Sequence, residues 1–102
     1  MTTDTIIEEK TVTNKRIKMP KKYKVLVLND DYTPMEFVVE MFSYVFRKSS
    51  HEAVALTMKI HTEGQAVAGI YTHEIAEQKV IEGTEMARAH GHPLILLSLI
   101  HI

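Results

Sequence analysis

The chain has 102 residues and a mass of 11.7 kDa, which is the size of one small domain. Its composition, 45% hydrophobic and 25% charged, is typical of a soluble globular fold, and its lack of cysteine excludes disulfides, thiolate metal sites and cysteine nucleophiles. The net charge of -1 predicts neither nucleic-acid nor membrane binding.

The charge is unevenly distributed along the chain. Residues 1–24 hold seven basic and three acidic side chains, whereas residues 25–102 hold five basic and ten acidic ones. We predict that residues 1–22 form a flexible extension, because apolar residues are too sparse there to repay the entropy of ordering, and that residues 23–102 form one folded domain. The basic cluster at 15–22 holds no aromatic side chain, which favours a solvated linker over a nucleic-acid patch.

The sequence predicts a cytoplasmic location. Residues 1–19 lack the apolar segment of a secretory signal, and no run of about 18 apolar residues is present to cross a membrane. Small secreted domains also usually need disulfides. We therefore expect a cytoplasmic protein with neither a membrane nor a nucleic acid as its partner.

The first predicted strand covers residues 24–28 (KVLVL), which are all apolar after the first position. We expect a helix to follow Thr33, whose hydroxyl is placed to cap it. Pro34 suits the first helical position, and Glu36, three residues after Thr33, completes a capping box. Apolar residues at helical spacing continue this helix to about Phe46.

Caps and glycines mark the next elements. A second helix is predicted to begin after Ser49 and to end at Gly64, which suits a left-handed C-terminal position. Residues 66–71 form a second predicted strand, and Thr72 is placed to cap a third helix that ends at Gly91.

Residues 94–102 complete the fold as a last strand. The order β-α-α-β-α-β predicts an α+β fold in which three helices cover a small antiparallel three-stranded sheet. The end of this strand, residues 97–102 (LSLIHI), is very apolar. It either completes the sheet or forms a sticky edge that contacts another molecule.

The sequence Asn29-Asp30-Asp31 lies at the end of the first predicted strand. Asn and Asp favour turns because they bond to their own backbone. A metal or phosphoacceptor site would need a further Asp and a Lys after later parallel strands, and this chain has too few strands. The third alternative is recognition of a cation: Asn and Asp oxygens accept from an ammonium group, and His61, when neutral, would add one more acceptor.

Neither an enzyme nor a metal site is favoured. Ser49, Ser50 and Ser98 lie at a cap or in a strand, and a nucleophile–base set is not apparent around them. His90 and His92 flank a predicted helix end, where C-terminal capping is a better explanation than metal binding. We therefore expect a binding protein that uses no metal or cofactor.

Four segments carry a family resemblance. They are residues 29–38 (NDDYTPMEFV), His61 with Gly64, residues 72–80 and residues 92–94 (HPL). In this order they closely resemble the ClpS family, the bacterial adaptors of the N-end rule pathway, over roughly residues 23–99. The resemblance implies a non-enzymatic adaptor that binds proteins beginning with Leu, Phe, Tyr or Trp and delivers them to the ClpAP protease.

The resemblance also implies roles for individual residues. Those that would hold the substrate's α-amino group are Asn29, Asp30 and His61, and those that would hold its backbone are Asp31 and Thr33. The side chain would enter an apolar pocket gated against β-branched residues by Met35. The other walls would be Val38, Ile60 and Leu94.

One wall departs from the family pattern. The family usually has methionine four residues before the histidine, and here Thr57 occupies that place. A shorter, β-branched wall predicts a ranking among Leu, Phe, Tyr and Trp that differs from that of a typical member.

Two further regions match the family by position. Glu74, Glu77 and Lys79 match its docking patch for the N-terminal domain of a ClpA-type AAA+ unfoldase, although a solvated helix face would carry the same residues. Residues 1–22 match the extension that the unfoldase engages during delivery. The competing hypothesis is an interaction module like the C-terminal domain of the ribosomal stalk protein, which shares the element order but lacks the Asn-Asp-Asp-Tyr-Thr-Pro motif.

Overall fold

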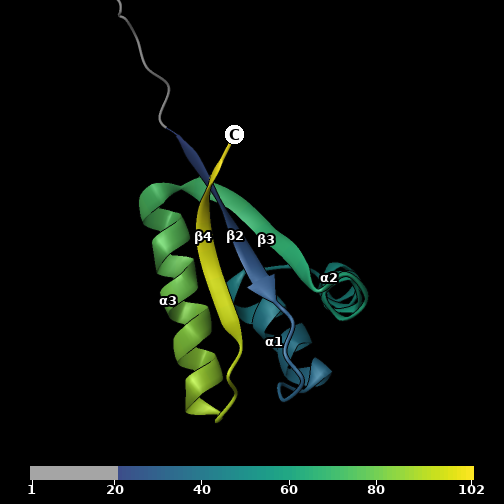
Figure 1. The fold of residues 1–102 in the computed structure, drawn as a ribbon. Coiled ribbons are helices and arrows are strands. Elements are labelled where there is room, and N and C mark those ends of the chain that lie inside the picture. Colours follow the sequence, from purple (N-terminus) through teal and green to yellow (C-terminus); the bar gives the residue numbers. More distant parts are fainter. Residues whose placement is uncertain (1–20) are drawn as a thin grey trace, which may run out of the picture.

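The computed structural model describes residues 21–102 and has the element order β-α-α-β-α-β. The predicted extension therefore lies almost wholly outside the described residues. The elements, labelled in Figure 1, are β2 (Lys22–Leu28), α1 (Met35–Val45), α2 (Ser50–Glu63), β3 (Gln65–Thr72), α3 (His73–Ala89) and β4 (Ile95–His101).

The three strands form one antiparallel sheet, as predicted, and their order in it is β3-β2-β4. The central strand β2 begins at Lys22, two residues earlier than the apolar run suggested, because the ladder pairs Lys22 with both Thr72 and His101. A β-bulge opposite Val25 and Leu26 shifts the register with β3. The sheet thus places the end of β2, with its acidic turn, beside the start of β4 (Figure 1).

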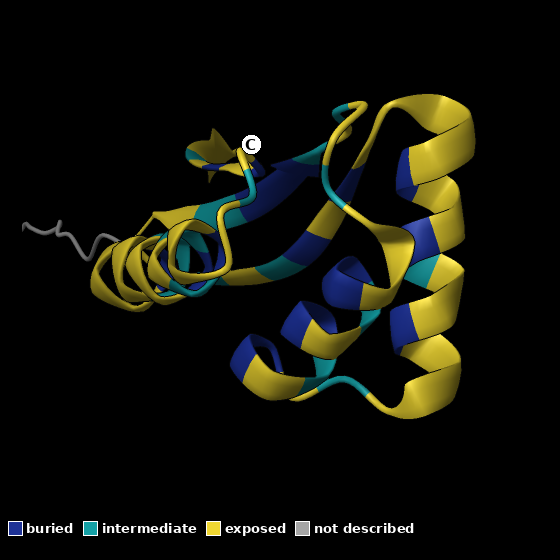
Figure 2. Cartoon of the chain, turned by 90° about the horizontal axis from the view of Figure 1, so that it is seen from below, coloured by how far each residue is buried: buried dark blue, intermediate teal, exposed yellow. Residues whose placement is uncertain are grey.

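Helices α1 and α3 pack on one face of the sheet, and α2 stands beside its β3 edge (Figure 1 and Figure 2). Val25 and Val27 of β2 and Leu96 of β4 point into the core, where they join Met41 and Phe42 of α1. Side chains alternate between the two faces of a strand, so the residues between these buried ones lie on the other face. That second face carries no helix among residues 21–102.

The start of α1 differs from the prediction. Pro34 is the N-cap, and the Thr33 hydroxyl donates to Oδ2 of Asp30 at 2.7 Å instead of capping the helix. The predicted capping box between Thr33 and Glu36 is therefore wrong. Because Pro34 takes the N-cap position, Thr33 lies one residue before the cap, where its hydroxyl donates to the Asp30 carboxylate.

The caps of α2 are confirmed. The Ser49 side chain accepts from the backbone N–H of Glu52 at 3.2 Å, and Gly64 adopts the left-handed conformation at φ 90°. Thr72 is the N-cap of α3 by position, although its side chain makes no capping bond within residues 21–102. Helix α3 ends at Ala89 with His90 as its C-cap, earlier than the predicted end at Gly91, which follows in the left-handed conformation at φ 76°.

Within residues 21–102, no helix is long and apolar enough to span a membrane.

Candidate functional site

The turn after β2 is organised by Asp30. Its Oδ1 accepts the backbone N–H groups of Tyr32 and Thr33, both at 2.8 Å, and its Oδ2 accepts the Thr33 hydroxyl. Partial burial acts to raise the pKa of Asp30, but these bonds and the charge of His92 together lower it below its usual value of 3.8. The carboxylate is thus held in its charged form by its own turn.

A backbone bond joins this turn to the end of α2. The N–H of Asn29 donates to the carbonyl of Gly64 at 2.9 Å. Because Gly64 closes the last turn of α2 with a bond to the Ile60 carbonyl, the strand end is brought beside His61. Residues separated by more than thirty positions in sequence therefore meet at one point.

A small cavity lies where the turn, α1, α2 and the start of β4 meet. Its volume is about 20 Å³, room for roughly one water molecule. Its lining contains both hydrogen-bonding and apolar side chains, and it includes every predicted residue of the amino-group and side-chain sites. The lining residues are Asn29, Asp30, Thr33, Met35, Val38, Thr57, Ile60, His61 and Leu94. Asp31 is exposed on the turn outside this lining.

The walls of the cavity differ in exposure. Val38, Thr57, Ile60 and Leu94 are all at most 5% exposed and are held by the surrounding core. Met35 is 39% exposed at the first position of α1, and an unbranched methionine changes rotamer easily. Met35 is consequently the wall that can move to admit a larger group.

Thr57 presents little polarity to the cavity. Its hydroxyl donates to the Ala53 carbonyl one turn earlier at 2.8 Å, and the residue is 3% exposed. The hydroxyl proton is thereby used within α2. Thr57 acts as a short wall rather than as a donor to a ligand.

The sequence-based analysis missed the contribution of His92 to this site. Its ring packs edge-on against Phe37 of α1, with centroids 4.7 Å apart, and its charge helps to lower the pKa of Asp30. In the sequence, the only sign of this contribution was the position of His92 in the HPL motif. The neighbouring His90 does lie at the helix end, with Nδ1 3.0 Å from the Met86 carbonyl. Across residues 21–102, no three His, Cys, Asp or Glu side chains gather as a metal site would require.

The predicted docking residues do not all lie together. Glu74 and Glu77 are three residues apart and so are neighbours on one side of α3, where Glu77 lies 3.6 Å from His73. Lys79 lies on another side of the helix, and its ammonium group donates to the Val45 carbonyl at 2.7 Å. Lys79 therefore ties α3 to the end of α1.

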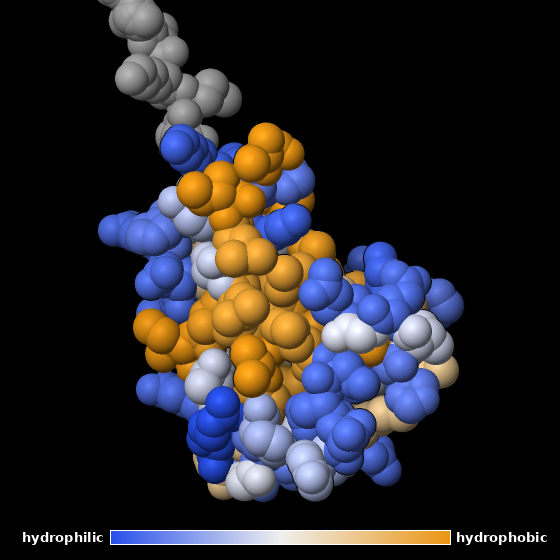
Figure 3. Space-filling view, viewed as in Figure 1, coloured by the Kyte–Doolittle hydropathy of each residue, from blue (hydrophilic) through white to orange (hydrophobic). Residues whose placement is uncertain are grey.

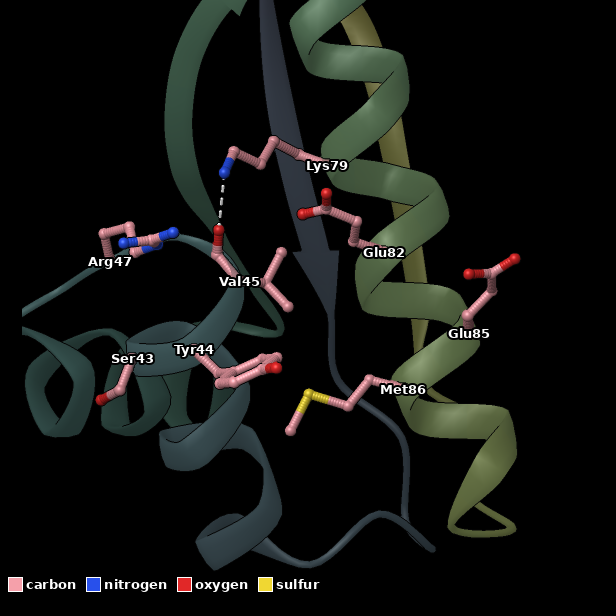
Figure 4. Close-up of a pocket in the computed structure, with 8 residues that line it drawn as sticks. All are labelled: Ser43, Tyr44, Val45, Arg47, Lys79, Glu82, Glu85 and Met86. Atoms are coloured by element: carbon pink, nitrogen blue, oxygen red, sulfur yellow. Dashed lines mark hydrogen bonds between the residues drawn. The ribbon is translucent and has the colours of Figure 1, made fainter.

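Lys79 also lines an open groove of about 820 Å³ between α1 and α3 (Figure 4). Tyr44 and Met86 point toward each other across this groove, and Glu82 and Glu85 extend from α3. The groove is separate from the small cavity, with which it shares no lining residue.

Comparison with known proteins identifies the family. The family model described as ATP-dependent Clp protease adaptor protein ClpS matches residues 18–97. The chain belongs to the ClpS family. This membership makes it a non-catalytic adaptor of the Clp protease, and it decides against the alternative of a ribosomal stalk domain.

Individual ClpS proteins are similar over most of their length. The chain is 46% identical over 95 residues to the ClpS adapter of Helicobacter hepaticus, covering 93% of this chain and 86% of the relative. It is 49% identical over 86 residues to that of Leptospira biflexa, covering 84% and 76% respectively.

A solved ClpS structure has the same fold. The structure of Agrobacterium tumefaciens ClpS2 bound to L-phenylalaninamide aligns with a TM-score of 0.79 and 40% identity. It covers 81% of this chain and all of the other. The ligand of that ClpS carries a free α-amino group and a benzyl side chain, the two chemical features that the predicted site would recognise.

Proposed function

We propose that this ClpS adaptor binds proteins that begin with Leu, Phe, Tyr or Trp and delivers them to a ClpA-type AAA+ unfoldase. The observation that carries the proposal is a cavity at the end of β2 in which hydrogen-bonding and apolar lining residues meet. An ammonium group needs acceptors, and a bulky first side chain needs an apolar space.

The amino group would be held mainly by the side chains of Asn29 and His61. The carboxylate of Asp30 already accepts three bonds within the turn, so its contribution is negative charge and the fixed shape of that turn. Asp31 and Thr33 would contact the first peptide units beyond the amino group. Thr33 uses its proton on Asp30, which leaves its oxygen free to accept.

The apolar pocket would open when the substrate enters. A cavity of about 20 Å³ is far too small for a Leu or Phe side chain. The buried walls Val38, Ile60 and Leu94 belong to the core, so opening falls to Met35 at the rim. A β-branched first residue would place a methyl group against Met35 and would be disfavoured.

Peptides test the recognition step directly. A peptide with N-terminal Phe is expected to bind in fluorescence anisotropy titrations, and its acetylated form to bind about 100-fold more weakly, because acetylation removes the charge and two donors. Asn29→Ala should weaken binding of the free peptide while leaving the circular dichroism spectrum unchanged. Equal binding of the free and acetylated peptides would contradict the proposal.

Glu74 and Glu77 are the proposed docking residues for the unfoldase N-terminal domain. The double variant Glu74→Ala and Glu77→Ala should lose binding to that domain and keep peptide binding. Glu85→Ala, an exposed acidic change farther along α3, is the matched control and should bind normally. Lys79 is less informative because its replacement also removes the bond to Val45.

A further inference from the structure

The face of the sheet opposite the helices is apolar. Figure 3 shows one continuous hydrophobic surface over the three strands. Five aliphatic side chains of β3 and β4 are each between 39% and 49% exposed there. They are Val67, Ile70, Ile95, Leu97 and Leu99. We call this surface, together with Leu26 and Leu28 of β2, the open sheet face.

The strand register explains why these residues form one surface. Leu26 pairs with Val67 on one side and Leu97 on the other, which makes an apolar row across all three strands. The next rows are Ile70, Lys24 and Leu99 at one end, and Gln65, Leu28 and Ile95 at the other. Leu26 is only 7% exposed because its two neighbours flank it. The surface is therefore mainly aliphatic, with Lys24 in one end row and Gln65 in the other.

The area suits a small protein interface. The five exposed fractions add up to about two fully exposed aliphatic residues, on the order of 400 Å² of apolar surface. A standard interface buries about 800 Å² per partner, of which somewhat more than half is apolar. The open sheet face thus provides most of the apolar centre of such an interface.

We propose that the open sheet face binds the same face of a second copy of this chain. Two sheets would pack about 10 Å apart, as in a β-sandwich. The cavity shares no lining residue with the open sheet face, so peptide binding remains possible in the dimer.

The row pattern favours a second copy as occupant. In this dimer the two-fold axis lies between the two sheets and runs along the row of Leu26, perpendicular to the strands. The central row of one copy then packs on the central row of the other, and each end row packs on the opposite end row. Lys24 then lies over Leu28 of the second copy instead of over another lysine, and its aliphatic stem packs while its ammonium group reaches solvent. Leu99 likewise lies over Ile95. The face is self-complementary in this arrangement, as a two-fold interface requires.

Sedimentation velocity on the full chain tests the proposal. Between about 1 µM and about 1 mM, the wild type is expected to pass from monomer to dimer. Leu97→Lys places a charge in the central row and should raise the dimer dissociation constant by at least about 10-fold.

Ile100→Lys is the matched control. Ile100 is on the same strand and is similarly exposed at 45%, but it lies on the helical face. The Ile100→Lys variant should dimerise as the wild type does, and both variants should keep the wild-type circular dichroism spectrum. A wild type that stays monomeric at about 1 mM overturns the proposal. Equal weakening of the dimer by both variants also overturns it. If the wild type forms no dimer and Leu97→Lys loses unfoldase binding, the face belongs to the unfoldase interface instead.

Discussion

The carboxylate of Asp30 accepts three hydrogen bonds from its own turn while it also lines the pocket. A residue expected to contact the substrate is therefore first a structural residue, and its loss should affect both folding and binding. Thr57 is comparable, since its hydroxyl serves α2 and its bulk forms a wall. At the scale of single residues, the hydrogen bonds decide which polar groups remain for the ligand.

The stability of the chain should depend on pH through Asp30. The folded pKa is below 3.8, so the unfolded state binds the proton more tightly and stability falls as pH drops through this region. We expect Asp30→Asn to be less stable than the wild type at pH 7 by about 1 kcal/mol. The difference should shrink between pH 5 and 3 in urea unfolding. A constant difference over that range would show that the charge of Asp30 contributes no stability.

Thr57→Met should alter the ranking of N-terminal residues. Methionine fills space that threonine leaves in the wall between α1 and α2, so the largest side chain, Trp, should lose affinity relative to Leu by about 10-fold. Competition titrations with peptides that differ only in the first residue measure this ratio. Thr57→Val keeps the shape of threonine and is the control. An unchanged ranking in Thr57→Met would remove Thr57 from specificity.

At the scale of secondary-structure elements, the ends of a strand and a helix position the site. The strand end at Asn29 and the helix end at Gly64 are joined by one backbone bond, and this bond brings His61 to the acidic turn. Lys79 does the same for α1 and α3 through the Val45 carbonyl. The joined ends of β2 and α2 thus set the geometry of the pocket, and a contact from the middle of α3 to the end of α1 ties the two helices that border the groove.

Gly64→Ala should destabilise the protein by about 1 kcal/mol, because the residue has φ 90° and L-residues other than glycine are strained there. A Cβ at Gly64 meets no atom within 4 Å, so the cost is conformational and not steric. Gly64→Asn tolerates the left-handed conformation and should recover part of the loss. Urea unfolding measures both, and equal stability of Gly64→Ala and the wild type would contradict the strain.

At the scale of the whole molecule, recognition and delivery are expected to occupy different parts of the chain. The cavity, the groove and the open sheet face are all formed by residues 21–102. The role of residues 1–20 in delivery rests on family resemblance and lies outside the described residues.

Deletion of residues 1–20 should separate the two activities. The shortened chain keeps every residue of the cavity, so peptide affinity should change less than about 2-fold. Degradation of a reporter with N-terminal Phe by the unfoldase and protease should be lost. A scrambled extension of the same composition is the control and should support degradation. Full degradation by the shortened chain would assign delivery to the folded domain alone.

The amino-acid sequence by itself determined the element order and most of the candidate site. Local sequence signals were sufficient where a short segment or one residue determines the local structure. Examples are the apolar run of β2, Ser49 at a helix start and Gly64 at a helix end. The pocket residues could be named because the motif NDDYTPMEFV, which carries most of them, resembles the ClpS family.

The tertiary structure decided the features that depend on contacts between residues distant in sequence or on a choice between neighbouring positions. The N-cap of α1 is Pro34 and not Thr33, whose hydroxyl donates to Asp30. The approach of His92 to Phe37 and Asp30, and the separation of Lys79 from Glu77, follow from packing. The apolar end of β4 was ambiguous in sequence. Only the strand register joined it to Leu26 and Val67 in one exposed face, because period-2 alternation assigns faces only once the pairing is known.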